Sequence, residues 1–507
     1  MTQHGSTSIR NGEPCNIADI PVLPLDVFRE QIIQAVKDGS WIAALHAVPD
    51  SETNLRAYAV LAHSSSGSLK LLSTQLPDSF ESLTPDCAQA NLFERELAEQ
   101  WGVKPIGHPW LKPVRFQHSN REKQVDGSQP FDSDKLPGVS DFFQIKGEEI
   151  HEVAVGPVHA GIIEPGHFRF QCHGENVLHL EIALGYQHRG VERAMIGGPN
   201  ARTIHLVETV AGDTTIGHTI AYCQIIEALA RANVPARASA LRAVSLELER
   251  LANHTGDLGA LAGDVGFLPT ASFCGRIRGE FLNLTALLCG NRFGRSMLCP
   301  GGVRFDVDNE RVQEFSVRFE KAVSDLTDSI NLLWQSPSVM DRFEDTGVIT
   351  TEDANEIGLV GLAARACGIE TDIRTDFPTG IYRFSNISTA TWHTGDVFSR
   401  AFVRWIEIQR SASFIRDQIK SLPQSDIRME LVPLEPNKLV VSLVEGWRGA
   451  ICHVAMTNSA GKFSHYKIID PSFHNWFGLA VAMRDQQISD FPLCNKSFSL
   501  SYCGHDL

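Results

Sequence analysis

The sequence predicts an α+β protein in which a small α+β domain precedes a mainly helical domain with small peripheral β-sheets. Three observations lead to this prediction. Residues 41–71 hold short apolar runs punctuated by Gly and Ser, a pattern typical of strands. Residues 117–149 are polar and contain Pro and Gly, which indicates a linker. From residue 200 onward helices dominate, and the apolar spacing of a helix is clearest over 235–263.

Length and charge restrict the function. A chain of 507 residues is long enough for two or three domains. Its net charge of −15 argues against nucleic acid as a partner and against direct binding to an anionic membrane. It has neither a run of about 20 apolar residues nor a secretory h-region at its start. We therefore expect a cytoplasmic protein that reaches a membrane only through partners.

The first domain is expected to span residues 21–116, after a disordered segment 1–20. Its first helix has Asp26 as a possible cap and ends before Gly39. Alternation of apolar and polar residues predicts a strand over 55–63. The expected elements are a helix over 26–37, strands over 41–48 and 55–63 and around 69–71, and a helix over 91–101.

The second domain is expected to span residues 150–507, after a linker over 117–149. It opens with two short strands, 168–172 and 177–183. In the helix predicted over 235–263, Glu247, Arg250 and His254 follow one another at i, i+3 and i+7 beside the apolar stripe. A structural strip of ion pairs is favoured there over a proton relay.

Cysteines are scattered along the chain. There are eleven of them, and no two form a Cys-x-x-Cys pair. In a cytosolic protein such thiols stay reduced. We expect most of them to be small core residues.

The stretch 186–218 contains the block His188-Arg189-Gly190-Val191-Glu192 and, about twenty residues later, a Gly/Thr-rich turn over 211–214. It resembles the large subunit of group 4 nickel–iron hydrogenases, the branch of formate hydrogenlyase and hydrogenase-4, which shares a fold with the 49-kilodalton subunit of complex I. In that branch a Cys-x-x-Cys that holds nickel follows the block at this distance. The corresponding residues here are Ala211 and Thr214.

Other blocks extend the resemblance over roughly residues 25–500. Residues 93–103 and 107–111 resemble the 30-kilodalton subunit of complex I, which the formate hydrogenlyase large subunit carries fused ahead of its hydrogenase-like domain. The blocks that resemble the hydrogenase-like domain are 156–159, 164–170, 276–278, 301–304, 372–378, 395–404 and 445–449. The order of the two domains is the same in this chain.

The end of the chain departs from the family pattern. Residues 490–493 match an acidic-apolar strand that precedes the family's second Cys-x-x-Cys, but Ser501 and Gly504 occupy the two cysteine positions. Cys503 lies one residue away from the second position. The quinone-binding His and Tyr of complex I relatives correspond to Pro165 and a position near Gly212, so a quinone pair is not evident either.

The resemblance implies a subunit of a membrane-associated hydrogenase-like or NADH-quinone oxidoreductase-like complex without an intact nickel–iron site. Soft sulfur ligands select such a metal, and the four positions offer two hydroxyls and no thiolate. Two alternatives stay open: a non-catalytic scaffold subunit of such a complex, and a genuine hydrogenase large subunit with a relocated site. No Gly-x-Gly-x-x-Gly follows a strand, so an NADH site is not encoded.

The same resemblance implies partners and cleft residues. The partners would be an iron–sulfur small subunit like the 20-kilodalton subunit of complex I, a ferredoxin-like subunit and antiporter-like membrane subunits, at the inner face of the cytoplasmic membrane. Iron–sulfur clusters are expected in those partners, and no cofactor is assigned to this chain. The candidate residues of the former metal cleft are His188, Arg189, Glu192, Asp213, His218 and Arg448.

Overall fold

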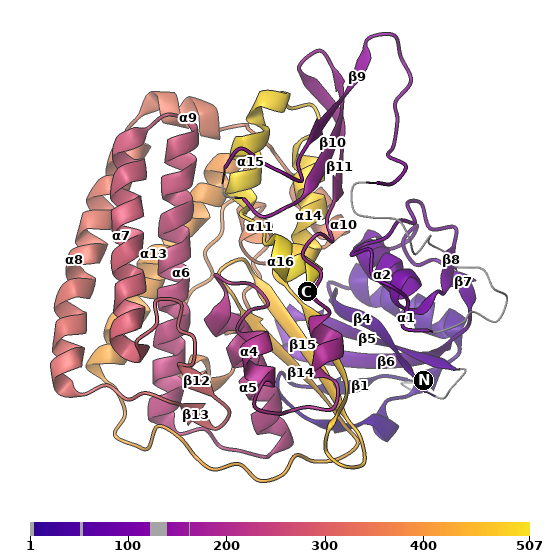
Figure 1. The fold of residues 1–507 in the computed structure, drawn as a ribbon, viewed down its shortest axis with the longest axis horizontal. Helices are drawn as coiled ribbons and strands as arrows, with labels where there is room; N and C mark the ends of the chain where they lie inside the picture. Colours follow the sequence, from indigo (N-terminus) through magenta and orange to yellow (C-terminus); the bar gives the residue numbers. More distant parts are fainter. Residues whose placement is uncertain (1–4, 51–53, 122–138, 162) are drawn as a thin grey trace.

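The structure is a computed structural model, and it describes residues 5–50, 54–121, 139–161 and 163–507. Figure 1 shows three regions: a bundle of long helices on the left, a sheet in the middle, and the N-terminal α+β domain on the right. A small three-stranded sheet projects at the top. The predicted fold class is confirmed. Within the described residues, no helix is long and apolar enough to cross a membrane.

The N-terminal domain is an antiparallel sheet covered by two helices. Strand order is β1-β6-β5-β4, and β3 pairs with β6 in parallel. The strands are β1 (Thr7–Ile9), β3 (Val22–Leu23), β4 (Trp41–Pro49), β5 (Leu55–His63), β6 (Ser68–Leu76), β7 (Ser79–Glu81) and β8 (Lys104–Ile106), and the helices are α1 (Leu25–Lys37) and α2 (Asn91–Trp101). The predicted strands and helices of this domain are confirmed to within a few residues.

The expectation of disorder over 1–20 is wrong for the described residues 5–20. Strands β1 and β2 (Cys15–Asn16) lie in this segment, and β2 pairs with β14 (Lys438–Glu445) of the second domain. The side chain of Asn11 donates to the carbonyl oxygens of Phe377 and Leu443 and accepts from the Leu443 N–H. The segment is ordered because it covers an otherwise open sheet edge, which its polar composition does not show.

A central sheet joins the two halves of the molecule. Its order is β16-β15-β14-β2, with β15 (Ala450–Thr457) and β16 (Phe463–Ile469) antiparallel. One face of this sheet shares a hydrophobic core with the N-terminal domain: Leu439 and Val441 of the sheet pack in the same buried cluster as Phe28 and Ile42, and Phe473 from outside the sheet joins them. The two halves are therefore joined through a common core as well as through the chain.

The second domain is mainly helical. Helix α6 (Ala236–Asp264), predicted over 235–263, packs against α7 (Leu268–Cys289) and α13 (Val397–Lys420), and α7 packs against α8 (Asn309–Trp334). Helix α5 (Thr215–Leu229) lies on the central sheet. The shorter elements are α3 (Val191–Met195), α4 (Thr203–Val207), β12 (Leu298–Cys299), β13 (Gly302–Val303), α9 (Pro337–Phe343), α10 (Thr351–Ile357), α11 (Gly361–Ala366) and α12 (Ile373–Asp376).

The predicted linker lies partly outside the described residues, which exclude 122–138. Residues 117–121 and 139–149 form no helix or strand. The chain then enters the projecting sheet, with order β11-β10-β9: β9 (Ile150–Val155), β10 (His167–His173) and β11 (Asn176–Ala183). The two strands predicted over 168–172 and 177–183 are confirmed.

One element near the C-terminus differs from the sequence prediction. The acidic-apolar stretch 490–493, matched to a strand, begins helix α15 (Phe491–Phe498) instead. Pro492 fits the first turn of a helix, and Leu493 and Phe498 are buried on it. Helices α14 (Pro471–Ala482) and α16 (Tyr502–Asp506) complete the C-terminal region, shown in yellow in Figure 1.

Candidate functional site

The guanidinium group of Arg189 brings two distant segments together. Its Nη1 donates to the carbonyl oxygen of Thr209 at 2.5 Å, and its Nη2 donates to the carbonyl oxygens of Val210 at 2.9 Å and Cys503 at 2.8 Å. The turn before α5 and the C-terminal segment are thus held by one side chain. These segments contain Ala211, Thr214, Ser501 and Gly504, the four positions that the sequence resemblance matched to the family's cysteines.

Arg448 and Asp213 form the charged pair at this junction. Arg448 donates to both carboxylate oxygens of Asp213 at 2.7 Å, and its Nε donates to the carbonyl oxygen of Ser499. The hydroxyl of Thr214 accepts from Arg448 at 3.2 Å and from the indole of Trp447 at 3.1 Å. Burial raises the pKa of Asp213, but the Arg448 guanidinium outweighs it and lowers that pKa below its ordinary value.

The four positions matched to the family's cysteines have ordinary structural surroundings. Ala211 is a buried methyl group, and the Thr214 hydroxyl is already hydrogen-bonded. The Ser501 hydroxyl accepts from the Gly504 N–H at 2.9 Å and so caps α16. Cys503 Sγ lies 3.4 Å from the Ser501 hydroxyl, and burial raises the pKa of this thiol to about 11. A thiol with that pKa is protonated at neutral pH.

Gly504 lies against a carboxylate. A Cβ atom added at Gly504 would lie 2.7 Å from the carboxylate carbon of Asp470 and 2.9 Å from the Ser501 hydroxyl. Van der Waals contacts between carbon atoms are about 3.5–4.0 Å, so this position has no room for a cysteine side chain. Within the described ranges, no group of three or more His, Cys, Asp or Glu side chains is arranged to hold a metal ion.

His218 belongs to a buried hydrogen-bonded chain that ends at Asp470. His218 Nε2 lies 3.0 Å from Asp470 Oδ2, and His218 Nδ1 lies 3.1 Å from His453 Nε2. His453 Nδ1 lies 2.9 Å from the Tyr466 hydroxyl. Burial lowers the pKa of His453 well below its ordinary value, which keeps this ring neutral. Because an ionised Asp470 only accepts, His218 Nε2 donates to it, and the hydrogen-bonded chain continues through His453 to the Tyr466 hydroxyl.

His188 binds the chain terminus. Its Nδ1 lies 2.8 Å from the carbonyl oxygen of Asp506, and the Asp506 carboxylate accepts from the N–H groups of Gly185 and Gln187. Burial lowers the pKa of His188. The block 188–192 therefore fixes the last residues of the chain in place beside the junction.

Glu192, the remaining candidate, joins a different group of charges. It accepts from the Ile468 N–H at 2.9 Å and pairs with Lys467 at 2.9 Å. Lys467 also pairs with Glu96 of α2 at 2.5 Å, and Glu96 pairs with Arg115. Burial opposes ionisation of Glu96, but Lys467 and Arg115 lower its pKa to about 2. Glu192 thus belongs to an ion-pair network between the two domains.

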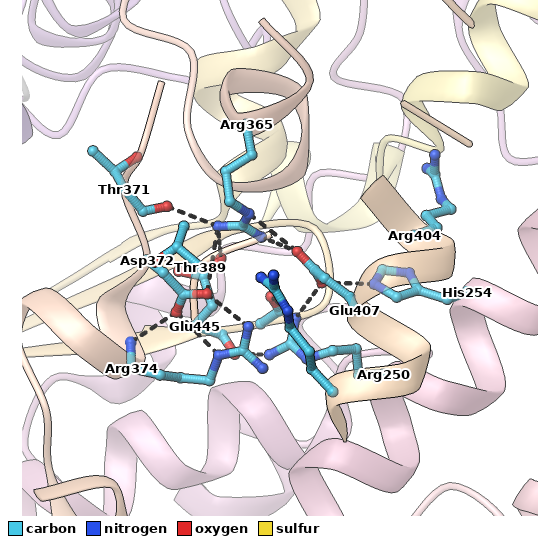
Figure 2. Close-up of polar contacts among 12 residues, drawn as sticks. Arg250, His254, Arg365, Thr371, Asp372, Arg374, Thr389, Arg404, Glu407 and Glu445 are labelled. Carbon is cyan, nitrogen blue, oxygen red and sulfur yellow. Dashed lines mark hydrogen bonds and ion pairs between the residues drawn. The ribbon is translucent and has the colours of Figure 1, made fainter. Parts of the chain in front are cut away.

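The strip of Glu247, Arg250 and His254 on α6 is part of a fully buried network. Figure 2 shows Arg250 and His254 of this strip beside Glu407. Glu407 of α13 is the centre of the network: it accepts from Arg365 at 2.6 Å, from Arg250 at 3.3 Å and from His254 at 2.8 Å. Burial opposes ionisation of Glu407, but Arg365, His254 and Arg250 lower its pKa well below the ordinary value.

Further carboxylates complete this network. Arg374 pairs with Asp372 at 2.6 Å and with Glu247 at 3.1 Å, and Arg365 donates to Glu445 at 2.8 Å. Burial raises the pKa of Glu445, against the opposing effect of Arg365. The structural ion-pair interpretation favoured from the spacing fits this geometry, because each charge has an oppositely charged contact.

The sequence did not point to Asp470, His453, Tyr466 or Trp447. Asp470 precedes Pro471 and caps α14 through the Ser472 N–H. An Asp-Pro-Ser start of a helix was a visible signal for its position, although not for its contact with His218. His453 and Tyr466 lie within apolar strands and carry no signal of their own.

Comparison with known proteins places both halves of the chain in known families. The family described as "Respiratory-chain NADH dehydrogenase, 30 Kd subunit" matches residues 30–123, and "Respiratory-chain NADH dehydrogenase, 49 Kd subunit" matches residues 264–435. The "Carbon monoxide-induced hydrogenase" of Rhodospirillum rubrum is 32% identical over 348 residues, which cover 68% of this chain and 96% of that protein.

Two relatives in Escherichia coli (strain K12) match more of the chain. "Hydrogenase-4 component G" and "Formate hydrogenlyase subunit 5" are each 27% identical over 83% of this chain, and the matches cover 75% and 76% of their lengths. The chain belongs to the family of group 4 nickel–iron hydrogenase large subunits, which is related to complex I, with domains like the two matched complex I subunits fused in one polypeptide.

Proposed function

We propose that this chain is the large-subunit component of a membrane-associated hydrogenase-like or NADH-quinone oxidoreductase-like electron-transfer complex, and that it holds no nickel–iron centre. Family membership and the fused domain order support the first part. The chemistry of the donor set supports the second, and it is the observation on which the proposal depends most.

A nickel–iron centre does not fit the residues at this junction. Such a centre needs thiolates, for which oxygen donors are no substitute. Thr214 and Ser501 supply hydroxyls that are already hydrogen-bonded, and Ala211 and Gly504 supply nothing. Asp470 occupies the space that a side chain at position 504 needs. No step of a reaction is therefore assigned to a metal in this chain.

Two of the six candidate cleft residues have the geometry for a role in proton or substrate handling. Asp213 is held ionised by Arg448, and 35% of its side chain is exposed. His218 connects Asp470 to two further hydrogen-bonding groups inside the core. A redox substrate that enters from the Asp213 side would meet a fixed negative charge and, behind it, a hydrogen-bonded chain.

The non-catalytic scaffold remains the second candidate function, because one observation favours it. The cavity that Asp213 lines holds only about 10 Å³. A single water needs about 10–15 Å³ of such volume, so this cavity is too small for a substrate. His188, Arg189 and Glu192 are occupied by structural hydrogen bonds, as a scaffold requires.

The proposal includes partners. An iron–sulfur subunit like the 20-kilodalton subunit of complex I would bind this chain, and a ferredoxin-like subunit and antiporter-like membrane subunits would complete the complex at the inner face of the cytoplasmic membrane. The loop 301–304 is a candidate contact. Arg304 is exposed and its side chain has no hydrogen bond or ion pair to another described residue, and Phe293 and Phe305 are exposed at 40% and 38%.

Affinity purification of the tagged chain from native membranes tests this proposal. Recovery with a stoichiometric iron–sulfur subunit and membrane subunits is the expected result. Recovery of the chain alone, as a soluble monodisperse monomer, would contradict both the electron-transfer and the scaffold functions. The turnover of the recovered wild-type complex is then compared with that of the Asp213→Asn complex. Lower turnover of the variant supports the electron-transfer function, and equal turnover supports the scaffold function.

A further inference from the structure

A second cavity lies away from the junction, between the N-terminal domain and the second domain. It has a volume of about 300 Å³ and is bounded by α2, the coil 109–116, β11 and α14. Aromatic and aliphatic side chains form most of its wall: Trp110, Phe116, Leu180, Trp476 and Phe477. Neither the electron-transfer function nor the scaffold function uses this cavity.

The charged side chains around this cavity are mainly cationic. Lys112 is neutralised by Glu181, which pairs with it at 2.6 Å. Arg95 and Arg484 also line the cavity, and within the part of the chain that the structure describes neither has a carboxylate within the 4.0 Å of an ion pair. The cavity therefore has two cations without an ion pair to any described side chain, Arg95 in its wall and the exposed Arg484 at its edge.

Arg95 is positioned by the backbone rather than by an acid. Its Nε donates to the carbonyl oxygen of Lys112 at 2.8 Å, and its Nη2 donates to that of Pro113 at 2.9 Å. Burial lowers its pKa to about 10, against weaker opposing effects of Glu181 and Glu99. A cation that has lost hydration without gaining an anion favours an anionic ligand.

A further polar atom lies in the wall of the cavity. His179 Nε2 is buried and has no hydrogen-bond partner among the residues described. Buried polar atoms are nearly always paired, so an unpaired one at a cavity indicates a ligand or water that completes it. With Arg95 and Arg484, His179 provides polar groups at an otherwise apolar site, which is the usual composition of small-molecule sites.

We propose that this interdomain cavity binds a small carboxylate with an apolar body, such as an aromatic or medium-chain aliphatic acid. The carboxylate pairs with Arg95 and Arg484, and the apolar body packs against Trp110 and Trp476. The volume lies at the lower end of the range of about 300–1,000 Å³ for ligand pockets, which excludes nucleotides and flavins. This inference does not depend on the proposed electron-transfer function.

Calorimetric titration of the full chain tests the site with four probes. Phenylacetate should bind at least about tenfold more tightly than phenylacetamide, which has the same shape without the charge. Acetate, which has the charge without the apolar body, should bind more weakly than phenylacetate. Decanoate that displaces phenylacetate indicates a fatty-acid ligand, and phenylacetate binding without displacement indicates a compact aromatic acid. Equal affinity for phenylacetamide and phenylacetate would overturn the proposal, as would no binding of either acid.

Two variants locate the binding. Ala480 lines the cavity on α14, so Ala480→Phe fills it and should abolish binding. Arg484 is exposed, so Arg484→Gln should leave the unfolding temperature unchanged. The affinity of this variant for phenylacetate should be about tenfold lower than that of the wild type. Glu175→Gln, an exposed change of charge outside the lining, should bind as the wild type does. Unchanged affinity in both cavity variants would place any binding elsewhere and overturn the proposal.

Discussion

The guanidinium of Arg448 and the carboxylate of Asp213 are joined by two hydrogen bonds of 2.7 Å each. The pair connects the turn between β14 and β15 to the turn that precedes α5, two segments 235 residues apart. An internal ion pair therefore fixes the junction that the sequence resemblance matched to the family's metal cleft.

Replacement of Arg448 by Gln should destabilise the protein by about 2 kcal/mol. Breaking a buried pair costs about 3–5 kcal/mol, and the partial exposure of Asp213 reduces that cost. Because the folded pKa of Asp213 is lowered, its contribution is fully present above the unfolded pKa of about 3.9 and is lost as pH falls through the folded value.

Denaturant unfolding of wild type and Arg448→Gln at pH 7 and at pH 3 measures both effects. The difference between the two proteins should shrink at the lower pH. The control is Arg416→Gln, which breaks an exposed pair with Glu320 and should cost less than about 1 kcal/mol. A loss equal to that of the control would show that the Arg448–Asp213 pair does not hold the cleft.

Charge reversal at Arg189 should affect folding, whereas charge reversal at Arg304 should affect assembly. Arg189→Glu places a carboxylate against three carbonyl oxygens and, because Arg189 is itself exposed, should cost about 1–2 kcal/mol. Arg304 is exposed, so Arg304→Glu should change stability by less than about 0.5 kcal/mol.

The thermal unfolding temperature and the amount of iron–sulfur partner recovered from membranes distinguish the effects of the two substitutions. Arg304→Glu should unfold at the wild-type temperature and recover less partner. If Arg304→Glu recovers as much partner as the wild type does, the loop 301–304 is not part of the interface.

Glu407→Gln should destabilise the protein more than Glu445→Gln. Glu407 accepts from two arginines and a histidine, so its loss leaves several buried cations undercompensated and should cost about 3–5 kcal/mol. Glu445 has a raised pKa, so its contribution is present below its unfolded pKa and falls as pH rises through the folded value.

Unfolding midpoints of the two variants between pH 4 and pH 8 provide the measurement. The deficit of Glu407→Gln should persist at neutral pH, and that of Glu445→Gln should be smallest there. The reverse order would mean that the charge at the centre of the network has been assigned to the wrong carboxylate.

The two halves should stay together when the chain is expressed as two polypeptides, 1–121 and 139–507. The shared core of Phe28, Ile42, Val441 and Phe473 and the pairing of β2 with β14 cross the division. Co-purification through a tag on one polypeptide is expected, and size exclusion should show a single 1:1 species. Independent elution would indicate that the contact between the domains is weaker than their shared core implies.

Much of the fold was predictable because it is local. Strand β5 and helix α6 follow from apolar periodicity, and their bounds differ from the predicted ones by at most one residue. The ordering of residues 5–20 depends on the contact of Asn11 with Leu443, which lies far away in the sequence on β14, and composition cannot show such a contact. The stretch 490–493 was misassigned because a short apolar run does not distinguish a strand from a first helical turn.

The candidate site was predictable only in part. Counting from the family motif predicted Ala211, Thr214, Ser501 and Gly504 as the positions of the family's cysteines, and that assignment stays a prediction. The structure shows that the segments containing them lie next to each other at Arg189. The contact of His218 with Asp470 spans 252 residues, and no local pattern encodes it. Glu192 was grouped with the cleft by sequence proximity, but its carboxylate turns toward Lys467 and the N-terminal domain.

Metal analysis of the native complex, purified through this chain from nickel-replete cells, decides whether the chain holds a nickel–iron centre. We expect iron from the partner subunit's clusters and no stoichiometric nickel, because the former cysteine positions offer no thiolate and Asp470 blocks position 504. One nickel per chain, retained through purification, would contradict the proposed function and favour a genuine hydrogenase large subunit with a relocated site.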